Sequence, residues 1–427
     1  VGSEMCIRDR SSTRMLRDEV FEILRKQEEW RRSCLNMIAS ENVTSKWVDR
    51  AYVNDFMHRY AEGVPFERHY QGAKFIDELE AYANKHFASK LGAQFADVRP
   101  ISGAIANMAA YGAFTKPGDL IAALPVPAGA HSSHTRGGVA GLLGLRTVEL
   151  PFDAEKMTMD SEAAAEVILD HKPKLTIIGA SLILFPFNLK PVAEACEEID
   201  CVLVYDAAHV LGLIYAGFFQ QPLKEGARIL TSSTHKTFPG PQGGIIAGRN
   251  VEWKKVQRAI FPKILSNHHL HRIPALLIAA FEMDEFGRDY ARQIVKNAKA
   301  LARELDRQGM KVLGKARGYT ETHQVVIDVS EFGGGKKVAE NLERANIIAN
   351  KNLLPYDELS WESVENPSGI RLGVQELTRF GMKEREMRIV GEFIARVVKG
   401  EKPESVREEV VNFRSQWQEI CYTWKGE

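Results

Sequence analysis

The sequence lacks an excess of charge of either sign and lacks any long hydrophobic run. Its 427 residues contain 56 Lys and Arg and 56 Asp and Glu, so the formal net charge is zero. A dedicated nucleic-acid-binding protein usually has a basic excess, and we therefore expect no nucleic acid among the partners. No segment reaches the ~18 consecutive apolar residues of a membrane helix, so we expect no membrane span either.

Cysteine is also scarce. The five cysteines are odd in number and widely spaced, which argues against a disulfide framework, and no CxxC pair suggests zinc. Reduced thiols fit a cytosolic protein, so the expected location is the cytoplasm. The N-terminal segment VGSEMCIRDR lacks the apolar core of a signal peptide, and we interpret residues 1–10 as a non-native scar.

What is present is an ordinary globular composition, with 44% hydrophobic and 26% charged residues. Residues 11–55 are expected to form an N-terminal arm that begins with an amphipathic helix over 11–30. From residue 97 onward, short apolar runs alternate with helical patterns. This alternation predicts an α/β domain over 56–286, with a mostly parallel sheet that is covered on both faces.

The remainder of the chain has a different pattern. A long charged helix over 291–308 and a strand over 324–329 predict a smaller α+β domain over 287–427. The strands expected in the larger, parallel sheet include 120–124, 175–180, 201–205 and 244–248.

Two expected strand ends carry groups suited to one cofactor. Asp206 ends the run CVLVY, and Lys236 follows the run RILTSS. A lysine that leaves a buried strand can lose its hydration, which lowers its pKa and makes it a nucleophile toward aldehydes. A facing carboxylate could keep a pyridinium nitrogen protonated, as a pyridoxal phosphate enzyme requires. Asp206 alone is more simply a turn aspartate, and Lys236 alone a surface lysine. The ordered pair, with His209 three residues after Asp206, favours the cofactor.

A phosphate site is expected in PISGAIAN, residues 100–107. Ser102 and Gly103 lie between a strand and a helix, where Ser102 can cap the helix and free N–H groups attract a phosphate. An ordinary capped helix is the alternative interpretation. The position of this segment in the same sheet as Asp206 and Lys236 favours the phosphate site.

At this point the sequence resembles a known family, serine hydroxymethyltransferase, over nearly the whole chain from about Met37 to Trp417. The segments SNHHLH and KPESVREEV resemble its archaeal branch. The resemblance implies a pyridoxal phosphate enzyme of fold type I, similar to aspartate aminotransferase. The matching motifs are NMIASENVTS at 36–45, YAEGVPFERHYQGAKFID at 60–77, DAAHVLGLI at 206–214, STHKTFPGPQGG at 233–244, NKNLLP at 350–355 and SGIRLG at 368–373.

The resemblance also implies a role for each matching residue at the cofactor. Lys236 would form the Schiff base, Asp206 would pair with the pyridine nitrogen, and His209 would lie near the phenolic oxygen. His131 would stack on the ring. The further cofactor-binding residues would be Ser102 and Gly103 at the phosphate, Ser181 at the side of the ring, and His235.

Other positions would bind the amino-acid substrate. Arg371 would clamp its carboxylate through two parallel hydrogen bonds, and Ser40 would bind the same group. Glu62 would be the acid and base near the substrate hydroxyl, with Tyr60 and Tyr70 lining the site. In the family, the last three residues reach the site from the neighbouring subunit, so a homodimer or a dimer of dimers is implied.

The sequence departs from the family at three positions. Ala104 replaces a serine that often binds the phosphate, and Gln242 stands where many bacterial members have arginine. Lys263 replaces a glycine in an FPG segment, where a positive φ would strain it. The histidines of 266–271 crowd together, but no cysteine or acidic residue follows at a zinc spacing, so no metal is predicted.

The implied reaction is the interconversion of serine and glycine in one-carbon metabolism. The carbon unit would pass to a reduced pterin, either tetrahydrofolate or tetrahydromethanopterin. One alternative is a pyridoxal phosphate aldolase that acts on threonine or 2-methylserine without a pterin. Another is a catalytically silent binding or regulatory protein, against which the presence of Lys236, Asp206, Arg371 and Glu62 argues.

Overall fold

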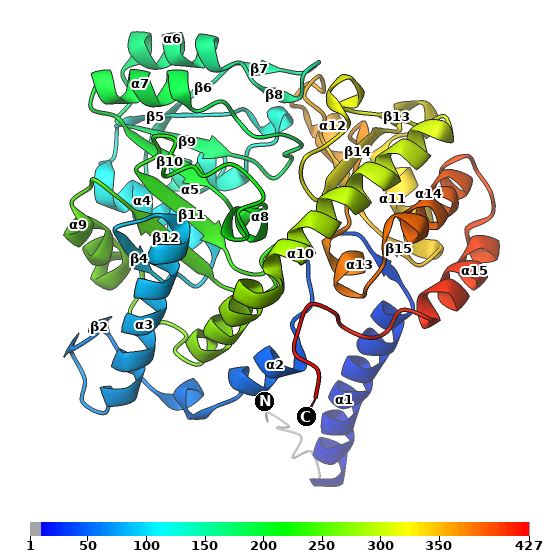
Figure 1. Ribbon diagram of the computed structural model, residues 1–427, viewed down its shortest axis with the longest axis horizontal. Coiled ribbons are helices and arrows are strands. Elements are labelled where there is room, and N and C mark those ends of the chain that lie inside the picture. The colour runs from blue at the N-terminus through cyan, green and yellow to red at the C-terminus, as the bar shows by residue number, and fades with distance from the viewer. Residues whose placement is uncertain (1–9, 427) are drawn as a thin grey trace, which may run out of the picture.

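A computed structural model of the chain describes residues 10–426. The segment interpreted as a scar therefore lies outside the described residues, apart from Arg10, where α1 begins. In Figure 1 the larger sheet fills the left half of the molecule, and a smaller sheet lies on the right. The long helix α10 (Arg272–Arg307) crosses between them.

The large sheet has seven strands in the order β4-β12-β11-β10-β9-β5-β6. The strands from β6 to β11 pair in parallel, so the expected mostly parallel sheet is confirmed. The bounds are β4 (Phe95–Asp97), β5 (Leu120–Ala123), β6 (Arg146–Glu149), β9 (Leu175–Gly179), β10 (Val202–Asp206), β11 (Ile229–Ser233) and β12 (Gly244–Gly248).

The strand at 244–248 is an exception, because β12 runs antiparallel to both β11 and β4. The expectation that this run belongs to the parallel set was wrong. A parallel crossover needs a dozen or more residues and usually a helix, whereas the connection 234–243 is short and consists of bends and loop. This connection carries Lys236, and the chain therefore turns back at the place where the lysine lies.

Apolar side chains bury both faces of the large sheet. Ile177, Val204 and Ile229 pack on one face with α4 and α9, whereas neighbours such as Leu203 and Leu230 point to the other face. The second cluster includes residues of α3, α7 and α8 and continues through α10 into the small sheet, so the two sheets share one core. The helix bounds are α3 (Lys74–Leu91), α4 (Gly103–Phe114), α7 (Lys190–Glu198), α8 (Leu211–Tyr215) and α9 (Trp253–Arg258).

The small sheet is antiparallel, in the order β13-β14-β17-β16. Helices α11, α14 and α15 pack beside it at the right of Figure 1, and β15 lies there too. The bounds are β13 (Lys311–Val312), β14 (Gln324–Asp328), β15 (Ile347–Ile348), β16 (Asn350–Asn352), β17 (Gly369–Gly373), α11 (Gly335–Arg344), α14 (Glu384–Val398) and α15 (Pro403–Ser415).

Helix α10 begins earlier than the predicted helix over 291–308. Its first half has buried residues on all sides, so the amphipathic period that revealed the second half is missing there. Pro274 lies in the first turn, where the missing N–H costs little. The division between domains at 286 and 287 stays a prediction, and α10 continues across it without a break. Neither α10 nor any other helix of residues 10–426 is long and apolar enough to cross a membrane.

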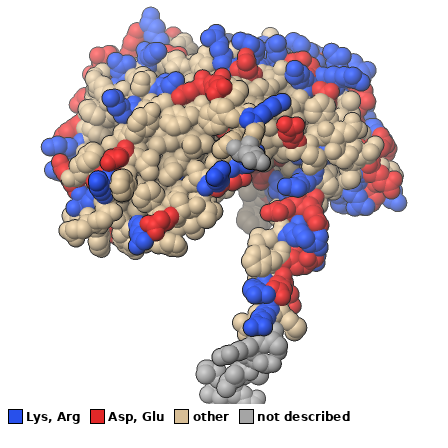
Figure 2. Space-filling model, turned by 60° about the horizontal axis from the view of Figure 1, so that its bottom comes forward, with Lys and Arg blue, Asp and Glu red and all other residues tan. Residues whose placement is uncertain are grey.

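The N-terminal arm begins with the expected helix, α1 (Arg10–Arg32), which projects away from the body in Figures 1 and 2. It is joined to the small sheet region through β1 (Leu35–Asn36), which pairs in parallel with β15. In the single chain, several large apolar side chains of α1 are exposed to solvent. These are Met15, Leu16, Val20, Phe21, Ile23, Leu24 and Trp30.

A stability prediction follows from the end of β9. Gly179 lies opposite Asp206 with φ +147°, and a Cβ there would lie 2.2 Å from the carbonyl oxygen of Asp206. We expect Gly179→Ala to lower the free energy of unfolding by about 2–3 kcal/mol in urea denaturation. The matched control is Gly217→Ala, where φ is +71° but no atom lies within 4 Å of the added carbon. Equal losses in the two variants would contradict the role of close packing at Gly179.

Candidate active site

The parallel strands bring the predicted cofactor residues to one edge of the sheet. Asp206 is the last residue of β10 and pairs with Gly179 on one side and Thr231 on the other. Lys236 follows β11, so both groups lie at the carboxyl ends of neighbouring strands. Ligands bind at this edge in open α/β sheets.

Asp206 is buried and fully hydrogen-bonded. His134 Nε2 lies 2.8 Å from its Oδ2, Asn107 Nδ2 donates to the same oxygen at 2.9 Å, and the Ala208 N–H donates to Oδ1 at 3.0 Å. Burial alone would raise the pKa of this carboxyl, but the hydrogen bonds and the charge of His134 hold the pKa well below its usual value. Asp206 is therefore a permanent anion inside the protein.

Sequence reasoning missed His134 and Asn107. Asn107 also accepts a hydrogen bond from Thr231 Oγ1 at 2.6 Å and donates to Ser133 Oγ at 3.0 Å, so it connects α4 with two strands and a loop. A signal was present in the sequence, because Asn107 is the one residue with a polar amide or charge in the apolar helix GAIANMAAYGAF. A polar side chain in such a helix must find buried partners.

Lys236 is largely buried, and burial lowers its pKa to about 8, with Arg371 acting in the same direction and Asp206 against it. The uncharged amine, which can attack an aldehyde, is then far more populated near neutral pH than in an ordinary lysine. The backbone of the lysine is held in place, because Asn42 Nδ2 donates to the Lys236 carbonyl at 2.7 Å and to Tyr290 Oη at 2.9 Å.

The three predicted histidines surround this lysine as neutral rings. Burial is the largest cause of a lowered pKa in each of them, and the positive charge of Lys236 adds to it. The pKa of His209 falls well below its usual value, and that of His235 falls to about 4. His209 Nδ1 lies 3.0 Å from Gln324 Nε2 of β14, so the neutral ring can accept a hydrogen bond from the small sheet. His131 caps a short turn with the same kind of ring nitrogen.

Arg371 reaches the same region from β17 of the small sheet. It is 6% exposed, and its Nη1 donates to the Ser181 carbonyl at 2.7 Å while its Nε donates to Asn350 Oδ1 at 3.1 Å. Among the ion pairs of residues 10–426, none involves Arg371, and burial lowers its pKa to about 10. A buried guanidinium held only by neutral oxygens is suited to a ligand carboxylate.

The predicted phosphate segment forms the start of α4. Ser102 is the N-cap residue, and its Oγ accepts from the Ile105 N–H at 3.1 Å. A Cβ on Gly103 would lie 3.2 Å from the Ser233 nitrogen, so the helix start is close to the end of β11. The free N–H groups of this first turn are suited to a phosphate. Ala104 adds no hydroxyl donor there.

One group of predicted substrate residues lies apart from this centre. Tyr60 and Tyr70 are half exposed and meet edge-on with ring centroids 5.7 Å apart, and Glu62 accepts a hydrogen bond from Ser266. These three residues flank the hairpin of β2 (Gly63–Val64) and β3 (Glu67–Arg68), and no contact described for them joins them to Lys236 in the same chain. Ser40 lines a cavity of about 920 Å³ together with His235 and Gln242.

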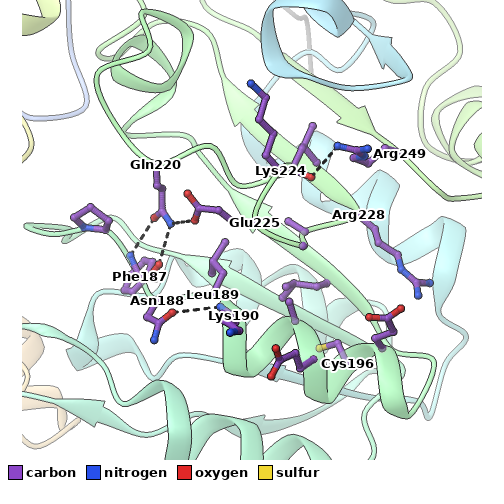
Figure 3. Close-up of a pocket in the computed structure, with 18 of the residues that line it drawn as sticks. Phe187, Asn188, Leu189, Lys190, Cys196, Gln220, Lys224, Glu225, Arg228 and Arg249 are labelled. Atoms are coloured by element: carbon purple, nitrogen blue, oxygen red, sulfur yellow. Dashed lines mark hydrogen bonds between the residues drawn. The ribbon is translucent and has the colours of Figure 1, made fainter.

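A larger cleft of about 1130 Å³, shown in Figure 3, contains none of the predicted residues. It lies at the opposite ends of β10 and β11, near Arg228 and Cys196. Its polar groups largely satisfy one another, since Gln220 donates to the Phe187 carbonyl and to Glu225. We therefore place the candidate chemistry at the site around Lys236, where a lysine of lowered pKa lies beside a buried carboxylate.

The histidines of the segment 266–271 make structural contacts. His268 is buried and bonded to Glu80, and His271 meets the Tyr52 ring edge-on. Among the described residues, no cluster of three or more His, Cys, Asp or Glu side chains is placed to hold a metal ion. Lys263 is not one of the described residues with a positive φ, so the strain expected from replacing glycine does not arise.

Comparison with known proteins agrees with this geometry. A family model described as serine hydroxymethyltransferase matches residues 14–394. The chain belongs to the serine hydroxymethyltransferase family. The enzymes of that name from Staphylothermus marinus, Pyrobaculum aerophilum and Sulfolobus acidocaldarius are 52%, 51% and 49% identical to it. The alignments cover 95–96% of this chain and 93–95% of theirs.

The resemblance seen in the sequence, including its archaeal branch, is thus confirmed. A solved structure of L-threonine transaldolase from Pseudomonas fluorescens, in its internal aldimine state, superposes with a TM-score of 0.88 at 29% identity. The match covers 97% of this chain and 94% of that one. The expected α/β architecture of fold type I is confirmed by the family and by this likeness.

The lowered pKa of Lys236 predicts a pH-dependent stability of the cofactor-free protein. Between the folded value of about 8 and the ordinary 10.5, the unfolded chain binds a proton that the folded chain does not. The ammonium therefore destabilises the fold below pH 8, and this penalty disappears as the pH rises past 10.5. We expect the stability advantage of Lys236→Met to shrink by about 2–3 kcal/mol from pH 7 to pH 10.5 in urea titrations. Lys224→Met, at an exposed lysine, is the matched control, and a pH dependence of equal size in that variant would contradict the assignment to Lys236.

Proposed function

We propose that this chain catalyses the interconversion of serine and glycine and transfers the one-carbon unit to a reduced pterin. The observation that carries the proposal is the meeting of a lysine of lowered pKa with a permanent carboxylate at adjacent strand ends. Family membership supports the same activity, that of a glycine hydroxymethyltransferase.

The site suits pyridoxal phosphate, which the family implies. Lys236 would bind its aldehyde, the anionic Asp206 would hold a proton on its ring nitrogen, and the start of α4 with Ser102 and Gly103 would hold its phosphate. When bound, the protonated ring withdraws electrons from the α-carbon of an attached amino acid. The neutral His131 would lie on the ring, with His209, His235 and the Ser181 segment completing the site.

Arg371 would bind the substrate carboxylate, with Ser40 as a second ligand. Its attachment to the Ser181 carbonyl fixes one edge of the guanidinium and leaves donors for a carboxylate. Glu62 would accept the proton of the serine hydroxyl as the Cα–Cβ bond breaks, directly or through water. Serine oriented in this way releases its hydroxymethyl carbon at the oxidation level of formaldehyde, which the pterin takes up.

A second subunit would bring Glu62, Tyr60 and Tyr70 to the Lys236 of the first. Figure 2 shows the face beside the projecting α1, where few charged side chains lie. Large exposed apolar residues of the segment 52–75, which carries the three residues, are Tyr52, Val53, Met57, Tyr60, Phe66, Tyr70 and Phe75. A surface of this kind is typical of a protein–protein interface. We therefore propose a homodimer or a dimer of dimers with shared active sites.

The carrier is tetrahydrofolate or tetrahydromethanopterin in this proposal, and the place of action is the cytoplasm. Free thiols support a reducing compartment, since the described cysteines Cys34, Cys196, Cys201 and Cys421 are unpaired. The structural likeness to an L-threonine transaldolase favours a second candidate, an aldolase that cleaves threonine or 2-methylserine without a pterin. The same lysine and aspartate would serve both reactions, so substrate assays must separate them.

We expect the purified holoenzyme to cleave serine rapidly only when one of the two reduced pterins is present. Parallel assays with tetrahydrofolate, tetrahydromethanopterin and no carrier, on serine and on threonine, test this. Fast threonine cleavage with no serine turnover under any condition would favour the aldolase instead.

Asp206→Asn should retain cofactor but lose at least ~10²-fold in kcat, because the ring nitrogen loses its anionic partner. The exposed Asp200→Asn is the matched control and should turn over serine normally.

Shared active sites predict complementation between two inactive variants. Lys236→Met and Glu62→Gln should each be inactive alone, but a mixed dimer rebuilds one complete site from Lys236 of one chain and Glu62 of the other. After unfolding and refolding a 1:1 mixture, we expect about a quarter of wild-type activity, because half of the dimers are mixed and each has one intact site. Activity that stays at the level of the separate variants would contradict the shared site.

A further inference from the structure

Arg272, at the first position of α10, lies directly behind the start of α4. Its side chain is 1% exposed. Nη1 donates to the Val98 carbonyl, and Nη2 donates to the Gly244 carbonyl at 3.0 Å and lies 3.5 Å from Thr234 Oγ1. The guanidinium thus connects the end of β4, the start of β12 and the segment that leads to Lys236.

This arginine has no carboxylate partner. Two other arginines, which are 2% and 0% exposed, form ion pairs: Arg99 with Asp97 at 2.7 Å and Arg379 with Glu282 at 3.1 Å. Arg272 takes part in none of the ion pairs found within residues 10–426, and its Nε is buried with no hydrogen-bond partner.

The electrostatic surroundings of Arg272 agree with this. Burial lowers its pKa to about 10, and only Tyr52 and Glu80 act in the opposite direction. The Glu80 carboxylate is already engaged by Arg68 and His268. A buried cation without its own counter-ion is costly, and a nearby anionic ligand offsets that cost.

Two glycines bring the guanidinium close to the phosphate segment. A Cβ on Gly243 would lie 2.1 Å from Arg272 Nε, so the guanidinium packs directly on this backbone. The next residue, Gly244, packs on the helix start in turn, where an added Cβ would lie 2.2 Å from the Ser102 carbonyl oxygen. Gly244 N–H also donates to the Pro100 carbonyl at 2.9 Å. One thin layer of backbone therefore separates the charge of Arg272 from the N–H groups of α4.

We propose that Arg272 is a positioning residue that supplies positive charge behind the helix start and strengthens binding of the cofactor's phosphate group. The inference rests on the proposed binding of pyridoxal phosphate. Arg272 does not touch the phosphate. It acts through the backbone of Gly244 and Ser102, which it holds in place, and through its charge, which is poorly screened because water is excluded around it.

The test compares two aldehydes that differ only in the phosphate. Cofactor-free wild type and Arg272→Gln are titrated with pyridoxal phosphate and with pyridoxal, and the dissociation constants are read from the absorbance of the bound form. We expect Arg272→Gln to weaken the binding of pyridoxal phosphate by about tenfold or more and the binding of pyridoxal by less than about threefold. Arg272→Lys, which keeps the charge, should recover most of the preference for the phosphorylated aldehyde.

A second measurement does not use the aldehyde. Inorganic phosphate should raise the melting temperature of the cofactor-free wild type, and should raise that of Arg272→Gln clearly less. Arg414→Gln is the matched control, because Arg414 is also 1% exposed with a buried nitrogen that has no partner, but it lies beside Phe380 and the Cys34 carbonyl. This control should keep the wild-type ratio of the two affinities.

The outcomes separate this inference from the proposed function. If Arg272→Gln binds both aldehydes more weakly by the same factor, the role of Arg272 is purely structural and the inference is overturned. Unchanged affinities would overturn it as well. If Arg272→Gln does not fold, Arg272→Lys and Arg272→Met provide the same comparison of charge kept and charge lost. If the wild-type protein itself binds neither aldehyde, the proposed function fails, whatever the variants do.

Discussion

The site depends on one constraint, which is that a carboxylate must stay charged inside the protein. Burial pushes Asp206 toward its neutral form, and hydrogen bonds from three separate segments reverse that tendency. The same anion acts on Lys236, whose pKa settles at about 8 between the effect of burial and the attraction of the carboxylate. A strand order that places β10 beside β11 is what brings these opposing groups together. Burial lowers the pKa of the surrounding histidines, and the positive charges already present lower it further, so these rings remain neutral.

Much of this arrangement could be predicted from the sequence, because it follows from local rules. Asp206 and Lys236 each follow an apolar run, and the carboxyl ends of parallel strands share an edge. Ser102 directly precedes a helix, where a serine side chain typically accepts a hydrogen bond from a backbone N–H of the first turn. Arg371 is different, since it comes from the small sheet, and no local pattern places it near Lys236. Its position was available only through resemblance to a family. The bonds of His134 and Asn107 to Asp206 were missed because they need three elements to pack at once.

The errors in the fold have a common physical origin. The first half of α10 and the strand β12 are buried on all sides, and a segment buried all round has no polar face from which its period or direction can be recognised. For β12 the decisive information was instead the short connection before it, which leaves no room for a crossover helix. The reversal has a chemical effect, because it places Gly244 against Ser102 and brings Arg272 within one backbone layer of the helix start.

Helix α10 has a mechanical consequence for the protein. Its 36 residues span roughly 54 Å and pack against α3 and α8 on one side and against β13 and β14 of the small sheet on the other. The helix therefore joins the lysine-bearing half to the arginine-bearing half. Hinged opening of the two halves would require this helix to bend in its middle, where there is no proline. The reach between amine and guanidinium is thus set during folding rather than at each turnover. In the proposed dimer, admission of the amino acid and exclusion of water would then rely on small loop movements and on the neighbouring subunit.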